Sequence, residues 1–146
     1  MKYRIIIAAS LLVFTACKDT KNDEKKLEAE VMEMHEKVMA DGETAMQNKM
    51  KLDTLLLKKD SVKRAFPALD TSAENKTMRS LSSRILKTDD AMSDWMHNYN
   101  PDFRGKSHQE VMNYLAQQKK TVGQINTAYK SVIQSSNQYL LKYKKK

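Results

Sequence analysis

The sequence predicts an all-α protein, an elongated up-down-up three-helix bundle that follows a cleaved lipoprotein signal peptide. Apolar residues recur at alternating spacings of three and four over three long stretches, the period of a helix that buries one face. The 146 residues include only three glycines and two prolines, so the chain has few turns and its helices should be long. Alternating β-branched and polar residues, which would indicate strands, are absent. We expect a signal peptide over 1–16, a charged linker over 17–23 and the bundle over 24–146.

The N-terminus has the three parts of a secretory signal. Lys2 and Arg4 give a positive start, and the apolar run over 5–14 is too short to span a bilayer as a helix. The segment Phe14-Thr15-Ala16-Cys17 resembles the lipobox of bacterial lipoproteins, with a departure at its first, usually aliphatic, position. This resemblance implies that Cys17 carries covalent lipid, palmitate included, and anchors the mature chain to a membrane. The alternative is an ordinary signal peptide followed by a chance cysteine, but one unpaired thiol would be unusual in an exported protein.

The residues after the cysteine favour the outer membrane. Residue 18 is a lysine and not the aspartate that resembles an inner-membrane retention signal. Lys18-Asp19 and Asp23-Glu24 resemble the export signals of Bacteroidota surface lipoproteins, so the periplasmic and the cell-surface face both stay open. The formal charge of +8 would suggest nucleic acid in a cytoplasmic protein, but export argues against it and acidic residues are interleaved with the lysines. We expect no nucleic-acid partner.

The first helix is expected over about 24–57 and carries two neighbouring apolar stripes. On a helical wheel they merge into one broad apolar face, which leaves room for self-association. His35, Gly42 and Asp53 fall within this face. The first stripe consists of Leu27, Val31, Met34, Val38, Ala45 and Leu52, with gaps at Asp41 and Asn48, and the second of Met32, Met39, Met46, Met50 and Leu57.

The second and third helices are expected over about 73–99 and 108–143, after a connector near 59–72. Asn100-Pro101 ends the second helix, and Ser107 with Glu110 forms a capping box at the start of the third. We place the Asp89-Asp90 pair on the solvent face. The heptad stripes are Met78, Leu81, Ile85, Thr88, Met92, Trp95 and Tyr99 in the second helix, and Val111, Leu115, Gln118, Val122, Ile125, Tyr129, Val132, Ser136, Tyr139 and Tyr143 in the third.

Short connections make neighbouring helices antiparallel, which gathers most methionines, the three histidines and the single tryptophan at the end nearer the anchor. Thioethers select Cu(I), and imidazole joins them readily. The candidate soft-metal ligands are therefore Met32, His35, Met39, Met92 and Met96. The other interpretation, our first, is that methionine fills irregular gaps in a core and that His35 is a buried histidine with a hydrogen-bond partner.

Two motifs resemble small lipoproteins of Bacteroidota, some of which are labelled "viral A-type inclusion protein". The resemblance covers the lipobox and most of the first two helices, whereas the third matches only as a generic heptad helix. It departs at His35-Glu36, where the family has His-Asp, and in its longer connector. It implies an envelope location and a helical fold. The motifs are Met32-x-x-His35-x-x-x-Met39 and Asp90-Ala91-Met92-x-x-Trp95-Met96-His97 followed by an Asn-Pro stop.

Signatures of enzymes are absent from the sequence. It contains no glycine-rich phosphate loop, nucleophile elbow or His-Glu-x-x-His motif. The sequence therefore predicts a non-enzymatic, lipid-anchored envelope protein that acts through protein or surface interactions, with no cofactor besides the lipid. The alternative is a lipoprotein that binds or senses a soft metal of the Cu(I) type.

Overall fold

The computed structural model describes residues 16–143, and the side chains among them from residue 20 onward. The signal peptide expected over 1–16 lies outside the described residues except for its last position, and so does the side chain of Cys17. Within the described part the chain is helical and has no strand, which confirms the all-α class. The elements are α1 (Ala16–Leu57), α2 (Lys59–Ala65), α3 (Thr71–Asn98), α4 (His108–Leu140) and the 3₁₀ helix η1 (Leu141–Tyr143).

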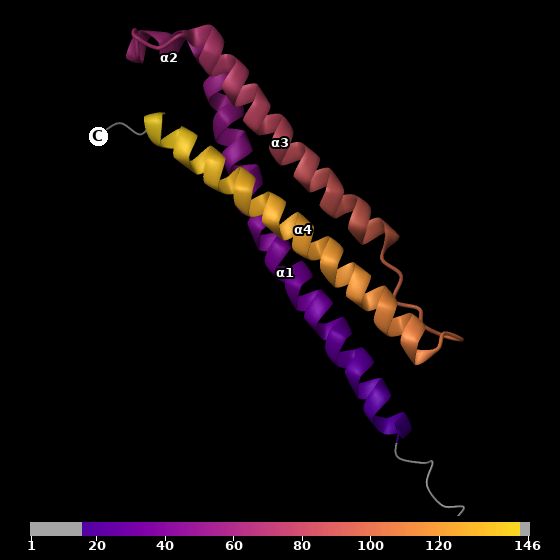
Figure 1. The fold of residues 1–146 in the computed structure, drawn as a ribbon. Helices are drawn as coiled ribbons and strands as arrows, with labels where there is room; N and C mark the ends of the chain where they lie inside the picture. The colour runs from indigo at the N-terminus through magenta and orange to yellow at the C-terminus, as the bar shows by residue number, and fades with distance from the viewer. Residues whose placement is uncertain (1–15, 144–146) are drawn as a thin grey trace, which may run out of the picture.

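The helices α1 and α4 run in the same direction along each other. Contacts between them begin with Glu24 and His108, whose Oε1 and Nδ1 atoms lie 2.8 Å apart. Near the other end, the Asn48 side chain donates to Ser136 Oγ at 3.0 Å. Figure 1 shows the resulting elongated shape, with the start of α1 projecting beyond the start of α4.

The helix α3 runs in the opposite direction to α1. Near the end of α3, Trp95 stacks on His35 in the first half of α1. Nearer the start of α3, the Ser82 hydroxyl donates to Asp53 Oδ1 at 3.0 Å, in the second half of α1. These contacts place the first half of α1 beside the end of α3 and the start of α4.

The helix ends follow their capping residues. The predicted capping box is confirmed, because Ser107 N donates to Glu110 Oε2 at 2.7 Å and Glu110 N donates back to Ser107 Oγ. Asp70 caps α3 by accepting hydrogen bonds from two backbone N–H groups. The helix then ends at Asn98, just before the Asn-Pro stop.

Two segments are more helical than the sequence indicated. Residues 17–23, expected as a charged linker before the first helix, belong to α1. This segment contains no glycine or proline that would interrupt a helix. The connector contains the short helix α2, which Phe66-Pro67 ends.

The core lies between α1, α3 and α4 and uses the heptad stripes of all three. In α1, Val31, Val38, Ala45 and Leu52 of the first stripe are buried, whereas Leu27 and Met34 are half-buried. The gap at Asn48 is filled by a buried amide that also donates to Asn137 Oδ1 at 2.8 Å. None of the described helices is long and apolar enough to cross a membrane. The buried cluster comprises Val31, Val38, Ala45, Leu52, Met78, Leu81, Ile85, Met92, Trp95, Val122, Ile125, Tyr129, Val132 and Tyr139.

The second stripe of α1 lies largely outside this core, and only Met46 packs against it. Met50 is 67% and Leu57 is 86% exposed. At about 100° per residue, the second stripe lies roughly 110° around the helix from the first. One helix pair cannot cover such an arc, so one stripe packs inside and the other faces outward.

Candidate functional site

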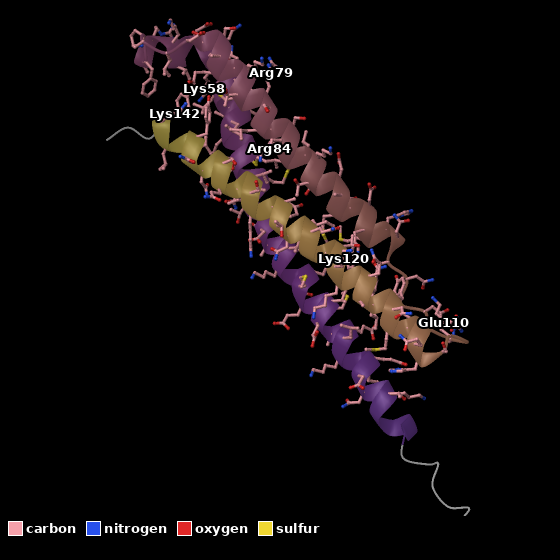
Figure 2. All side chains as sticks on the ribbon, viewed as in Figure 1. Lys58, Arg79, Arg84, Glu110, Lys120 and Lys142 are labelled. Carbon is pink, nitrogen blue, oxygen red and sulfur yellow. The ribbon has the colours of Figure 1, made fainter. Side chains whose placement is uncertain are left out.

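Charged side chains project from the outer surface, among them Lys58, Arg79, Arg84 and Lys120 (Figure 2). An apolar strip interrupts them along α1 and the end of α3. Met39 is 44% and Met96 is 42% exposed, and the strip continues toward the far end of α1. We call it the methionine face. It consists of Met32, Met39, Met46, Met50 and Leu57 of α1 together with Met96 of α3.

Part of this face is hollowed into a groove of about 560 Å³ between α1 and α3. Met39 and Met46 line it from α1, and Met92 and Met96 line it from α3. Met92 is buried, with 2% of its surface exposed, whereas Met39 and Met96 are open to solvent. We call this the methionine groove. It unites three of the five predicted soft-metal ligands and adds Met46, which the sequence placed in the second stripe but not in the site.

The methionine groove also has a polar part. Tyr129 Oη donates to Asp89 Oδ1 at 3.1 Å, and both residues line the groove. Burial, and then the neighbouring Asp89 carboxylate, raise the pKa of the Tyr129 phenol. The phenol therefore stays neutral at physiological pH and acts as a hydrogen-bond donor.

Placing Asp89 on the solvent face was wrong. Its side chain is half-buried between helices, whereas Asp90 is exposed as expected. The sequence spacing could have predicted that Asp89 faces the groove. Asp89, Met92 and Met96 are spaced i, i+3 and i+7 and therefore share one side of α3.

The remaining predicted ligands, Met32 and His35, do not line the methionine groove. His35 is half-buried and stacks on Trp95, with 5.5 Å between ring centroids. Its Nδ1 atom is buried without a hydrogen-bond partner among the described residues, contrary to the expectation of a hydrogen-bonded histidine. The Trp95 indole donates instead to Gln118 Oε1 at 2.8 Å. The five predicted ligands thus do not form one set.

The three histidines occupy one end of the molecule but do not converge. His97 is exposed, and His108 is engaged with Glu24. In the described part of the chain, no three His, Cys, Asp or Glu side chains form a group that could hold a metal ion. Thioether sulfur atoms are a separate ligand class, and in this structure they gather in the methionine groove.

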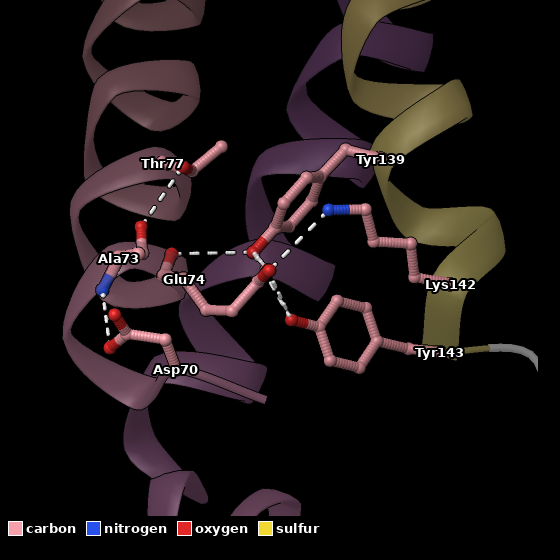
Figure 3. A network of polar contacts seen from close by, with 7 residues as sticks. All are labelled: Asp70, Ala73, Glu74, Thr77, Tyr139, Lys142 and Tyr143. Carbon is pink, nitrogen blue, oxygen red and sulfur yellow. Dashed lines mark hydrogen bonds and ion pairs between the residues drawn. The ribbon is translucent and has the colours of Figure 1, made fainter. Parts of the chain in front are cut away.

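A polar network that the sequence did not indicate joins the start of α3 to the end of α4 (Figure 3). Glu74 Oε2 accepts hydrogen bonds from Tyr139 Oη and, at 2.8 Å, from Tyr143 Oη. Lys142 Nζ lies 3.4 Å from Glu74 Oε1 and 4.7 Å from the centre of the Tyr139 ring. We call these four residues the Glu74 clasp.

The electrostatics of the Glu74 clasp favour an ionised carboxylate. The hydrogen bond from Tyr139 lowers the pKa of Glu74, and the contacts with Tyr143 and Lys142 add to this against the opposing effect of burial. Burial raises the pKa of Tyr139, and its hydrogen bond to Glu74 raises it further. The clasp is therefore one carboxylate held by two neutral phenols and a lysine, which suits a structural tie between helix ends.

A larger groove of about 850 Å³ lies between α1 and α4, next to the Glu74 clasp. Met50 and Leu55 of α1 line it together with Leu140 of α4 and Leu141 of η1. Because Met50 belongs to this groove and to the methionine face, the apolar surface of α1 continues from one side of the helix to the other.

No protein-family model, curated protein or solved structure matches the chain. The arguments about function therefore rest on its own residues. The methionine face offers apolar contact, and the methionine groove offers soft sulfur ligands.

Proposed function

We propose that the protein is a non-enzymatic, lipid-anchored component of the outer-membrane envelope that acts through contacts of its long helical surface. In this proposal the mature protein is an elongated up-down-up three-helix bundle, held to the membrane by lipid on Cys17. The lipobox-like segment supports the anchor. It leaves open whether the bundle faces the periplasm or the cell exterior.

The observation that carries the proposal is the methionine face. Four apolar side chains of α1 and one of α3 are between 37% and 86% exposed along one strip, although the same helices have a well-filled core. Exposed apolar strips with a polar surround are characteristic of interaction sites. Methionine suits such a site because its flexible, polarisable side chain adapts to a partner.

In-cell photo-crosslinking tests this role. A photo-reactive amino acid at Met39 is expected to give crosslinked products in intact cells. The matched control is Lys87, which is also exposed but lies in a shallow groove between α3 and α4, on the other side of α3. Products at position 39 and none at position 87 support the proposal, whereas equal yields or none at position 39 contradict it.

A second candidate function is soft-metal binding, and the observation that favours it is the methionine groove. Four thioethers from two helices line one groove, and Cu(I) and Ag(I) prefer such ligands. Ligands from two helices would tie α1 to α3, so a bound ion should raise the melting temperature.

The test is an Ag(I) titration of the mature chain carrying Cys17→Ser, so that no thiol competes for the ion. Under this candidate function, quenching of Trp95 fluorescence is expected to saturate near one equivalent. Met39→Leu with Met96→Leu should abolish it, since leucine keeps the side-chain volume but removes the sulfur. Met32→Leu is the control, because Met32 lies on the methionine face outside the groove lining. Absent saturation, or saturation that survives the double variant, would exclude this function.

A further inference from the structure

We infer that the methionine face is covered by the same face of a second copy of the chain, with the two α1 helices antiparallel. The inference rests on the proposed function, in which this face is the interaction surface. It names the partner and the orientation.

The spacing of the exposed side chains is self-complementary in that orientation. Consider a two-fold axis that passes α1 midway between Thr44 and Ala45. Met39 and Met50 are equally far from this point along the helix, so Met39 of one copy lies opposite Met50 of the other. Met32 and Leu57 are likewise equidistant from it and face each other, and the two Met46 side chains meet near the axis. Each apolar residue of the stripe thus meets an apolar residue.

The charges of α1 select the antiparallel orientation. Residues 23–43 contain eight acidic and three basic side chains, whereas residues 44–57, up to the end of α1, contain one acidic and two basic ones. Residues 58–65, which follow α1 and include α2, add one acidic and four basic side chains. Parallel pairing would place acidic half against acidic half and basic half against basic half. Antiparallel pairing places each acidic half against a basic half, which favours this orientation and disfavours the other.

Four particular residues flank the stripe on one edge of the helical wheel. Glu33 and Glu36 lie in the acidic half of α1, Lys51 lies in its second half, and Lys58 directly follows its end; all four are exposed. The ion pairs of the described residues involve other side chains. Around the same axis, Glu36 and Glu33 come opposite positions 53 and 56 of the second copy. Lys51 and Lys58 lie two residues, or about 3 Å along the helix, from those positions and within reach of the two carboxylates; Lys58 is labelled in Figure 2.

The size of the contact indicates a weak, reversible dimer. At about 1.5 Å per residue, the stripe from Met32 to Leu57 is about 38 Å long, and it presents only five apolar side chains per copy. Confinement to a membrane raises the effective concentration and would favour the pair there. The two Cys17 positions would lie about 80 Å apart at opposite ends, so both lipids enter one membrane only if the rods lie along its surface.

Disulfide trapping in the membrane tests the pairing on the full-length, processed chain. Two differently labelled copies are co-expressed, one carrying Met39→Cys and the other Met50→Cys. Oxidation is expected to form an intermolecular disulfide between position 39 of one copy and position 50 of the other. Met39→Cys alone should give no dimer, because two positions 39 lie on opposite sides of the axis and about 16 Å apart. Lys87→Cys, exposed on the other side of α3, is the control and should also give none.

Charge reversal supplies a second, independent readout. Glu33→Lys with Glu36→Lys, or Lys51→Glu with Lys58→Glu, is expected to reduce the yield of the 39–50 disulfide about tenfold, since several weak ion pairs become repulsive. The chain that carries all four changes should recover the yield, because each pair regains opposite charges. A structural defect would not be repaired by further mutation.

The outcomes separate this inference from the proposed function. Trapping between two positions 39 would show a parallel pair and overturn the inference. Photo-crosslinking of position 39 to a different protein, without self-products, would overturn the dimer and leave the interaction role intact. Loss of all crosslinks at position 39 would contradict both.

Discussion

Gly42 of α1 lies directly against the phenol of Tyr129 in α4. A Cβ built on Gly42 would lie 3.1 Å from Tyr129 Oη and 3.3 Å from its Cζ. The phenol cannot easily move away, because it donates a hydrogen bond to Asp89 of α3. One glycine thus allows a contact through which all three long helices meet.

We predict that Gly42→Ala destabilises the protein. Alanine is favoured over glycine inside a helix by about 1 kcal/mol, but overpacking a filled site costs about 1–3 kcal/mol. The expected net effect is a loss of about 1 kcal/mol in the free energy of unfolding, measured by denaturant titration. Gly123→Ala is the matched control, because its Cβ would meet only Met34 Sδ, at an ordinary 3.8 Å, and it should gain about 1 kcal/mol. Equal stabilisation by both changes would show that Tyr129 yields freely.

Which residues of α3 and α4 pack inward around Tyr129 could be predicted in part from the sequence. The stripes of α3 and α4 follow from apolar spacing, because a helix that packs on two neighbours must bury one continuous line of residues. Asp89 was misplaced because its charge suggested solvent, whereas its position beside Ile85 and Met92 turns it inward. The hydrogen bond from Tyr129 satisfies the half-buried Asp89 carboxylate. Tyr129 lies on another helix, so the residue spacing within α3 alone could not predict this partner.

The Glu74 clasp predicts a loss of stability in acid. The contacts of the carboxylate lower its pKa in the folded state, so its contribution is present above the unfolded pKa of about 4.5. That contribution is lost as the pH falls through the lower, folded pKa. Glu74→Gln should therefore destabilise the protein by about 1–2 kcal/mol at pH 7, and the difference from the parent should shrink toward pH 3.

The measurement is denaturant unfolding at several pH values between 3 and 7, to cover this window. Asp90→Asn is the control, since it removes an exposed carboxylate from the same helix. It should leave the stability nearly unchanged across the range. A constant difference between Glu74→Gln and the parent at every pH would contradict a role for the ionised carboxylate.

The buried stripe of α4 predicts a strong effect at Ile125, which lies in the core cluster. Ile125→Ala should cost about 2–5 kcal/mol. Ile125→Asp should cost more, because it buries a charge without a partner. Thermal unfolding followed by circular dichroism measures both. Lys130→Ala, exposed on the same helix, is the control and should change little; an Ile125→Asp protein as stable as the parent would remove this residue from the core.

The candidate site was harder to predict than the core. The sequence placed the Met39, Met92 and Met96 side chains near one another correctly, because antiparallel order fixes which halves of α1 and α3 are neighbours. It could not separate them from Met32 and His35, since all five lie on apolar faces. Which of two adjacent stripes packs inside depends on where the third helix sits, and that position is a tertiary property.

The anchor is the last prediction, and the envelope role depends on it. If Cys17 carries lipid, metabolic labelling with palmitate should mark the chain, and Cys17→Ser should abolish the label and leave a precursor that retains residues 1–16. Lys21→Ser, four residues further along, alters a charge but not the thiol and should label and mature as the parent does. Mass spectrometry of the N-terminus distinguishes the two alternatives directly. A mature chain that begins at residue 17 without lipid would be an ordinary secreted protein. Since confinement to a membrane is what favours a weak contact through the methionine face, such a protein should also give few disulfides between positions 39 and 50.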